Sequence, residues 1–175
     1  MQITIKRLSV NDAPALCEMA KQTFYSTFKD TCTPADMQLF LEENYNQPIA
    51  ESELLNNNDW YFFAEVEGVP AGYLRFMEDY SYFPLIKKWK AIELKRLYVL
   101  EAFHGKGIAQ QLMDFLLAFA NENKYEVVWL GVWENNFRAQ KFYSKYSFSF
   151  SNHTHDFPIG NTPQTDQWWW KFLST

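Results

Sequence analysis

Cysteine is scarce in this chain of 175 residues, which contains only Cys17 and Cys32. The two form no CxxC pair, and neither lies at a spacing from histidine that is typical of a zinc site. The sequence therefore predicts no disulfide framework and no bound metal. Neither cysteine has an adjacent histidine that would activate it as a nucleophile, so we interpret both as ordinary thiols.

Long apolar runs and a surplus of basic charge are also missing. No stretch approaches the roughly 20 apolar residues of a membrane-spanning helix, and residues 1–8 lack the continuous apolar core of a signal peptide. The net charge is −5, which phosphate backbones repel unless basic residues cluster. We therefore expect a cytoplasmic protein that binds neither membranes nor nucleic acid. One basic group is interpreted as a solvated edge: Lys87, Lys88, Lys90, Lys95 and Arg96.

Large side chains, by contrast, are abundant. Hydrophobic residues make up 47% of the chain and aromatic residues 19%, a composition that supports a sizeable core. The length fits one domain, which we expect to span residues 1–175. Hydrophobic periodicity predicts an α/β fold with a mixed sheet, in the order strand, two helices, three strands, helix, strand, helix, two strands.

Helical spacing of apolar residues, together with capping residues, predicts the helices. Asn11 or Asp12 is a candidate cap for the first helix, and Thr33 is a candidate cap for the second. The third helix follows a glycine-rich turn, and the fourth carries an aromatic side. We expect these helices near residues 12–24, 34–45, 108–119 and 138–146.

The strands are predicted from short β-rich runs and from the turns between them. Glu67-Gly68 is typical of a two-residue hairpin turn. The apolar spacing slips between Leu94 and Leu97, as a β-bulge would make it do. We expect strands near residues 3–8, 60–66, 69–76, 92–99, 127–132, 148–150 and 167–173.

The glycine-rich turn is the pattern most informative about function. A predicted strand ends at Leu97-Tyr98-Val99, and after a short connection the run His104-Gly105-Lys106-Gly107-Ile108-Ala109 opens a helix. Unpaired N–H groups and the helix dipole attract phosphate there, and glycine lets it approach the backbone closely. The run fits neither the dinucleotide GxGxxG pattern nor the P-loop. Two glycines before a helix are also common in plain tight turns.

The same run resembles the signature [Arg/Gln]-x-x-Gly-x-[Gly/Ala] of the GNAT N-acetyltransferases. Gly107 and Ala109 fill its last two specified places, while His104 stands where the family usually has Arg or Gln. A second stretch, residues 134–143, resembles the family's Asn-x-x-Ala-x-x-[Phe/Leu]-Tyr motif. The residues that fill it are Asn136, Ala139, Phe142 and Tyr143.

Further similarity extends over nearly the whole chain. The hairpin at residues 64–73 and the opening at residues 5–12 are similar to those of the family, and residues 155–166 resemble a subgroup of bacterial polyamine acetyltransferases. The resemblance implies a mixed, mostly antiparallel central sheet, flanked by helices, whose fourth and fifth strands splay apart. Acetyl-CoA would lie in the opening as a co-substrate.

The resemblance also implies how the cofactor would be held. The backbone of Leu97 and Val99 would pair with the pantetheine arm like an added strand, and the turn would grip the pyrophosphate. Asn136 would bond the arm, cap the helix that follows it, or both. The implied cofactor-binding set is Leu97, Tyr98, Val99, His104, Gly105, Lys106, Gly107, Ile108, Ala109 and Asn136.

Two residues are the candidates for catalysis. Direct transfer needs a base for the amine and a proton or a donor for the leaving thiolate. The second motif implies Tyr143 as general acid, although periodicity alone would make it a core aromatic. Glu93 matches the position of a glutamate base in some family members; otherwise it is a solvated strand residue, and a water chain takes the proton.

The acceptor is predicted from charge. Between Lys29 and Arg75 the chain has no Lys or Arg but many Asp and Glu, and in the family this region lines the acceptor mouth. An acidic mouth would concentrate cationic amines, so we expect a polyamine or another small primary amine; a solvated acidic face is the alternative. A protein lysine or N-terminal amine, a non-catalytic acyl-CoA-binding module and a homodimer all stay open.

Overall fold

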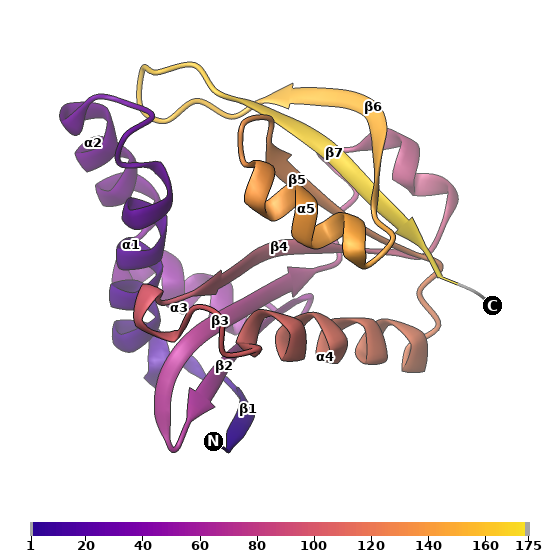
Figure 1. Ribbon diagram of the computed structural model, residues 1–175, viewed down its shortest axis with the longest axis horizontal. Coiled ribbons are helices and arrows are strands. Elements are labelled where there is room, and N and C mark those ends of the chain that lie inside the picture. Colours follow the sequence, from indigo (N-terminus) through magenta and orange to yellow (C-terminus); the bar gives the residue numbers. More distant parts are fainter. Residues whose placement is uncertain (1, 174–175) are drawn as a thin grey trace.

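A seven-stranded sheet organises the chain in the computed structural model, which describes residues 2–173 (Figure 1). The strand order across the sheet is β1-β2-β3-β4-β5-β7-β6. Neighbouring strands are antiparallel except β4 and β5, which are parallel. The predicted mixed, mostly antiparallel α/β sheet is therefore confirmed. The strands are β1 Ile3–Arg7, β2 Asp59–Val66, β3 Val69–Met77, β4 Ala91–Val99, β5 Val127–Trp133, β6 Ser149–Asp156 and β7 Thr165–Phe172.

Helices cover both faces of this sheet (Figure 1). Strand residues alternate between the faces, so Phe62 packs toward α4 while its neighbours Tyr61 and Phe63 pack toward α1, α2 and α3. The side of α5 that carries Phe142 and Tyr143 joins the α4 side of the core. The helices are α1 Ala13–Phe28, α2 Pro34–Asn44, α3 Gln47–Leu55, α4 Ile108–Glu122 and α5 Phe137–Lys145.

Helix α3 is an element that the periodicity did not predict, because only two helices were expected before the first hairpin. It buries a single residue fully, Ala50, so its apolar stripe is too weak to find. Its start was nevertheless readable: the Asn46 side chain accepts a hydrogen bond from the N–H of Ile49 at 3.0 Å, and Pro48 lies in the first turn.

The caps of the first two helices differ in outcome. Thr33 caps α2 as predicted, since its hydroxyl accepts a hydrogen bond from the N–H of Asp36 at 3.1 Å. Asp12 stands at the N-cap position of α1, but neither it nor Asn11 caps the helix with its side chain. The Asp12 carboxylate instead accepts from Lys6 Nζ at 2.7 Å and from the N–H of Ser9 at 2.9 Å. The predicted side-chain cap is therefore wrong there.

The predicted hairpin turn and bulge are both confirmed. Glu67 and Gly68 have φ values of 51° and 82°, as a two-residue turn between twisted strands requires. In β4 the pairing with β3 passes from Arg96 to Leu94, which leaves Lys95 without a partner residue in the register. Glu93 and Arg96 are three residues apart and would face opposite sides of a regular strand. Because of the bulge, they lie on the same face of the sheet.

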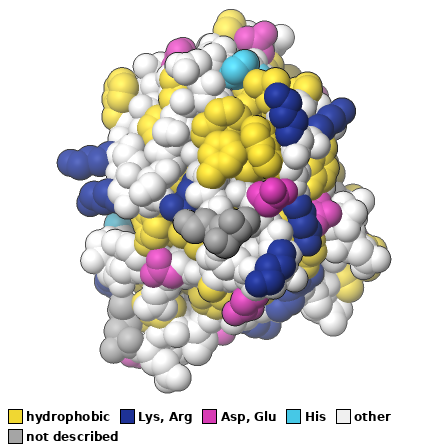
Figure 2. Space-filling view, turned by 90° about the vertical axis from the view of Figure 1, so that its right-hand side faces the viewer, with side chains coloured by type: hydrophobic (Ala, Val, Ile, Leu, Met, Phe, Trp, Pro, Cys, Tyr) yellow, Lys and Arg dark blue, Asp and Glu magenta, His cyan; other side chains and the backbone are white. Residues whose placement is uncertain are grey.

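The last strand ends at an aromatic surface. Trp168 and Trp169 are buried in this strand. Trp170 and Phe172 pack edge to face with Trp89. Figure 2 faces the side on which β7 ends and shows hydrophobic side chains gathered among Lys and Arg. None of the helices within residues 2–173 is long and apolar enough to cross a membrane.

The feature that positions the site is the divergence of β4 from β5. The two strands pair only over three positions, of which Glu93 and Trp129 are the last. Beyond them β4 continues along β3 as far as Val99, and β5 continues along β7 as far as Trp133. The facing edges therefore separate, and the predicted splay of the fourth and fifth strands is confirmed.

One carboxylate ties the loop between β6 and β7 to helix α2. Asp36 accepts hydrogen bonds at 2.8 Å from the Thr33 hydroxyl, the Asn161 N–H and the Thr162 hydroxyl. These donors stabilise the charged form and lower the pKa of Asp36 to about 2. Gly160 has a φ of 56°, and a Cβ on it would lie 2.6 Å from Asp36 Oδ1. The tight approach therefore needs glycine.

Asp36→Asn should destabilise the protein in a pH-dependent way. The folded pKa of Asp36 is lowered from 3.8 to about 2, so its contribution is fully present above pH 4 and is lost as the pH falls toward 2. The difference in unfolding free energy between wild type and variant should therefore shrink over this window in urea titrations. Glu43→Gln is the control, because Glu43 is exposed. If the difference in unfolding free energy does not depend on pH, the contact of Asp36 with the β6–β7 loop depends on the shape of the side chain and not on its charge.

Candidate functional site

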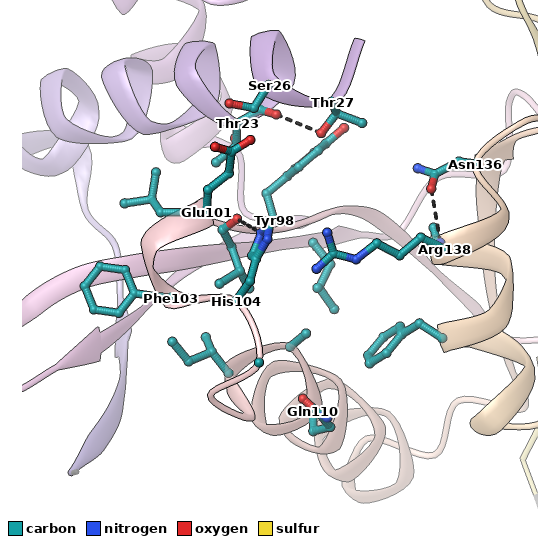
Figure 3. Close-up of a pocket in the computed structure, with 18 of the residues that line it drawn as sticks. Thr23, Ser26, Thr27, Tyr98, Glu101, Phe103, His104, Gln110, Asn136 and Arg138 are labelled. Carbon is teal, nitrogen blue, oxygen red and sulfur yellow. Dashed lines mark hydrogen bonds between the residues drawn. The ribbon is translucent and has the colours of Figure 1, made fainter.

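Two cavities meet where β4 and β5 separate. The first has a volume of about 550 Å³ and lies between α1, the end of β4 and the starts of α4 and α5 (Figure 3). The second has a volume of about 630 Å³ and lies between α1, α2 and the β4–β5–β7 side of the opening. They share a wall, which is made of Leu97, Tyr98, Asn136, Ala139 and Tyr143.

The first cavity collects most of the residues that the sequence singled out for a cofactor. One member of that set, Lys106, does not line it; its ammonium instead lies 4.9 Å from the centre of the Phe103 ring. The members that line the cavity are Leu97, Tyr98, Val99, His104, Gly105, Gly107, Ile108, Ala109 and Asn136.

The glycine-rich turn presents backbone donors to this cavity. Gly105 and Gly107 have φ values of 76° and 79°, which only glycine adopts without strain. Gln111 makes the first bond within α4, to Gly107 O at 3.1 Å. The N–H groups of residues 108–110 have no partner among residues 2–173. Free donors and the positive end of a 15-residue helix make this a site for an anion.

The end of β4 offers a free backbone edge to the same cavity. Leu100 N–H donates to Ala71 O on the β3 side at 2.9 Å. Because backbone groups alternate along a strand, those of Val99 and Leu97 point the other way, into the opening. His104 confirms the direction for Val99, since its Nε2 lies 2.8 Å from Val99 O. A ligand with amide groups can therefore add to β4 at Leu97.

His104 acts in this structure as a brace. Its bond to Val99 O spans the short connection between β4 and α4, and a carbonyl accepts, so Nε2 carries the proton. The ring therefore fixes the turn relative to the strand end. Its side chain differs from the Arg or Gln of the resembled signature, but the backbone donors of the turn do not depend on it.

Several lining residues were absent from the residues singled out in the sequence. Helix α1 contributes Thr23, Ser26 and Thr27, and α5 contributes Arg138, whose side chain extends into the cavity in Figure 3. The three hydroxyl residues share one face of α1 at i, i+3, i+4 spacing, which was a readable signal. Arg138 is exposed and also faces the cavity.

Asn136 and Tyr143 stand on α5 at the shared wall. Asn136 Oδ1 accepts from the N–H of Ala139 at 3.1 Å, so Asn136 caps the helix. The Tyr143 hydroxyl has no hydrogen-bond partner within residues 2–173, and burial raises the pKa of this phenol above its usual value. Tyr143 is therefore a neutral donor that faces both cavities near neutral pH.

Glu93 lies on the wall of the second cavity and is 2% exposed. Its interpretation as a solvated strand residue is therefore wrong. Oε1 accepts from Lys95 Nζ at 3.1 Å, whereas Oε2 is buried without a partner in the described chain. Burial raises the pKa of Glu93 and the charge of Lys95 opposes that rise.

The acidic residues of the second cavity are not those that the sequence predicted. Of the acidic side chains between Lys29 and Arg75, Glu53 alone among the described residues lines this cavity. Helices α1 and α2 do line the cavity, but with apolar rings such as Phe28 and Phe40. The predicted acidic mouth on this segment is wrong. The other acids come from β4, β6, β7 and the loop after β3, namely Glu93, Asp156, Asp166 and Asp79.

Arginine and lysine side chains neutralise only part of this charge. Glu53 pairs with Arg75 at 2.8 Å and with Arg96 at 3.5 Å, and Glu93 pairs with Lys95. Asp79, Asp156 and Asp166 form no ion pair with any described residue. The second cavity therefore keeps a surplus of carboxylates, which favours a cationic ligand.

Known proteins resemble this chain in sequence. The family model described as the acetyltransferase (GNAT) family matches residues 14–148. An uncharacterised N-acetyltransferase of Lactobacillus delbrueckii subsp. lactis is 32% identical over 94% of each chain. An uncharacterised N-acetyltransferase of Mycobacterium tuberculosis is 29% identical over 90% of this chain and 95% of its own.

Solved structures share the fold. The paia N-acetyltransferase of Thermoplasma acidophilum, in complex with coenzyme A, has a TM-score of 0.79 at 19% identity and covers 99% of this chain and 100% of its own. A GCN5-related N-acetyltransferase of Rhodopseudomonas palustris has a TM-score of 0.77 at 14% identity and covers 99% of this chain and 97% of its own. At these identities the likeness concerns the fold.

Proposed function

The chain belongs to the acetyltransferase (GNAT) family, and we propose that it acetylates a small amine that carries further positive charge, such as a polyamine. The family makes it an acetyl-CoA-dependent N-acetyltransferase. The observation that carries the proposal is the second cavity, which meets the first at Tyr143 and holds Asp79, Asp156 and Asp166 without cationic partners. A cationic amine would supply the missing charge.

Acetyl-CoA would occupy the first cavity. Its pyrophosphate fits the free N–H groups at the start of α4, where Gly107 allows close approach. Its pantetheine arm carries amides that fit the free edge of β4 at Leu97 and the N–H of Val99, whose carbonyl is already bonded to His104. Arg138 would add a cation on the α5 side. The acetyl group would then lie at the wall that both cavities share.

Direct transfer follows from such a placement. An amine in the second cavity loses a proton to Glu93, directly or through a water, and its nitrogen attacks the thioester carbon. The new C–N bond forms as the C–S bond breaks, and the electron pair leaves on sulfur. The Tyr143 hydroxyl, kept neutral by burial, protonates the thiolate or donates a hydrogen bond to it. The raised pKa of Glu93 makes it a stronger base.

Gly107→Glu should abolish cofactor binding. Coenzyme A should raise the melting temperature of the wild type, as a ligand selective for the folded state does. The variant places a carboxylate where the pyrophosphate would lie and should show no rise. Gly68→Glu is the matched control, since Gly68 has a similar φ of 82° in the β2–β3 turn and does not line the first cavity. A wild type that shows no rise at millimolar coenzyme A would refute the cofactor site.

Tyr143→Phe should lower kcat by roughly 10²-fold, the low end for loss of a general acid. The phenyl ring keeps the packing, so the shift in melting temperature with coenzyme A should stay the same. Tyr146→Phe serves as the control, because Tyr146 bonds Gln110 O and lines neither cavity. Equal kcat values in the wild type and Tyr143→Phe would remove the hydroxyl from the mechanism.

The acceptor class is tested by thiol release from acetyl-CoA. Spermidine should have a higher kcat/KM than an amino-acid amide or a lysine peptide, because the free carboxylates attract added charge. Its advantage should shrink at high salt, since the screening length falls from about 8 Å at physiological ionic strength to about 3 Å at 1 M. A peptide that outperforms spermidine, or a salt-independent preference, would contradict the proposal.

A further inference from the structure

A missing side chain on β5 opens part of the second cavity. Trp129, Gly131 and Trp133 alternate onto one face of the strand, and Gly131 leaves a gap between the two tryptophans. A Cβ on Gly131 would lie 3.0 Å from Trp168 Cζ3 and 3.2 Å from Asp166 Oδ2. Its backbone is outside the left-handed region, so glycine is needed for space, not for conformation. The Asp166 carboxylate therefore packs against β5 at Gly131.

The Asp166 carboxylate lacks a partner in this position. Its Oδ1 is buried without a hydrogen bond to any described residue. Burial raises the pKa of Asp166 to about 7, and the charge of Lys95 opposes the rise. A carboxylate removed from water costs free energy unless a cation or donors compensate it. Its register partner His155 does not compensate it, because Nδ1 bonds the carbonyl of Asp156 instead.

A second residue of the same cavity, Glu93, also has an oxygen without a partner among the described residues. Glu93 is 2% exposed, and its Oε2 has no partner within residues 2–173. Lys95 is held at Glu93 Oε1, 3.1 Å away, so it leaves Glu93 Oε2 and Asp166 Oδ1 free. The two carboxylates stand on strands from different sides of the opening, β4 and β7. Two carboxylates with spare acceptor capacity therefore line one cavity, and a ligand with two cationic groups could compensate both.

The cavity that holds both carboxylates is also lined by aromatic rings. The rings of Trp133, Trp168 and Phe157 line the cavity, and such faces accept both methylene groups and ammonium ions. The other charged or titratable groups that line the cavity are Lys95, His155, Asp79, Asp156, Glu53, Arg75 and Arg96. The two arginines are paired with Glu53 and Asp59. The His155 ring packs against Trp168 with ring centres 3.8 Å apart and a tilt of 56°, and burial lowers the pKa of His155.

We propose that Asp166 is a specificity-determining residue that binds the ammonium group of the acceptor that is not acetylated. The inference rests on the proposed function, in which Glu93 receives the proton of the reacting amine. Asp166 then selects diamines and polyamines over monoamines of equal length. Asp166 would act through binding and would contact no reacting atom. Substitution of Asp166 should therefore raise KM and leave kcat unchanged.

The test compares 1,4-diaminobutane with butylamine in the thiol-release assay. In the wild type the diamine should have the higher kcat/KM. Asp166→Asn should lower kcat/KM for the diamine roughly 10- to 100-fold, as expected for one lost charged hydrogen bond, through a higher KM. Butylamine should be almost unaffected. Glu93→Gln should instead lower kcat for both amines.

Two further variants exclude a general structural effect. Asp156→Asn removes a neighbouring carboxylate that is exposed and should change the diamine preference much less. Gly131→Ala presses a methyl group onto Asp166 and Trp168 and should reduce the preference without abolishing butylamine acetylation. Each variant should keep the wild-type shift in melting temperature with coenzyme A, which reports an intact fold.

The outcomes separate this inference from the proposed function. If the wild type prefers the diamine and Asp166→Asn keeps that preference, Asp166 is not the selecting residue while the proposed function stands. A wild type that shows no preference, or a variant that loses both amines equally, also overturns the inference. If the wild type acetylates neither amine but acetylates a peptide, the proposed function and the inference both fail.

Discussion

The structure depends on the point at which β5 leaves β4. As far as Glu93 and Trp129, the backbone groups of β4 and β5 pair with each other. Beyond that point β4 pairs only with β3, and β5 pairs only with β7. Backbone groups that have lost their neighbour must find another partner, and here the partner is a ligand or His104. Both cavities, the free edge at Leu97 and the position of Tyr143 follow from this separation.

A buried charge network accounts for the sign of the second cavity. Arg75 is 5% exposed and makes two bonds to Asp59, at 3.0 and 2.6 Å, and one to Glu53 at 2.8 Å. Arg96 joins the network through Glu53 and the Tyr61 hydroxyl. Removing one member would leave an uncompensated buried charge. The network attaches α3 to the sheet. Because Arg75 and Arg96 are already paired within it, the unpaired carboxylates give the cavity a net negative charge.

Local patterns predicted the strands, the turns and most of the helices, because the causes of these elements are local. The turn at Gly107, the cap at Thr33 and the bulge near Lys95 each depend on a few adjacent residues. The second cavity depends on side chains far apart in sequence, such as Glu93 and Asp166. No local pattern shows that Glu93 is buried or that the Asp166 side chain packs against Gly131. Local patterns also could not show that, of the acidic residues between Lys29 and Arg75, only Glu53 among those described lines the second cavity.

The wall that the two cavities share has a kinetic consequence. Leu97, Tyr98 and Tyr143 belong to both surfaces, so whatever fills one cavity becomes part of the boundary of the other. If acetyl-CoA fills the first cavity as proposed, the amine side would be complete only after acetyl-CoA has bound, which would favour ordered addition with acetyl-CoA first. Each cavity also has lining of its own, from α4 on one side and from β7 on the other. A substitution on either of these two elements would therefore alter the lining of one cavity and leave the shared wall in place.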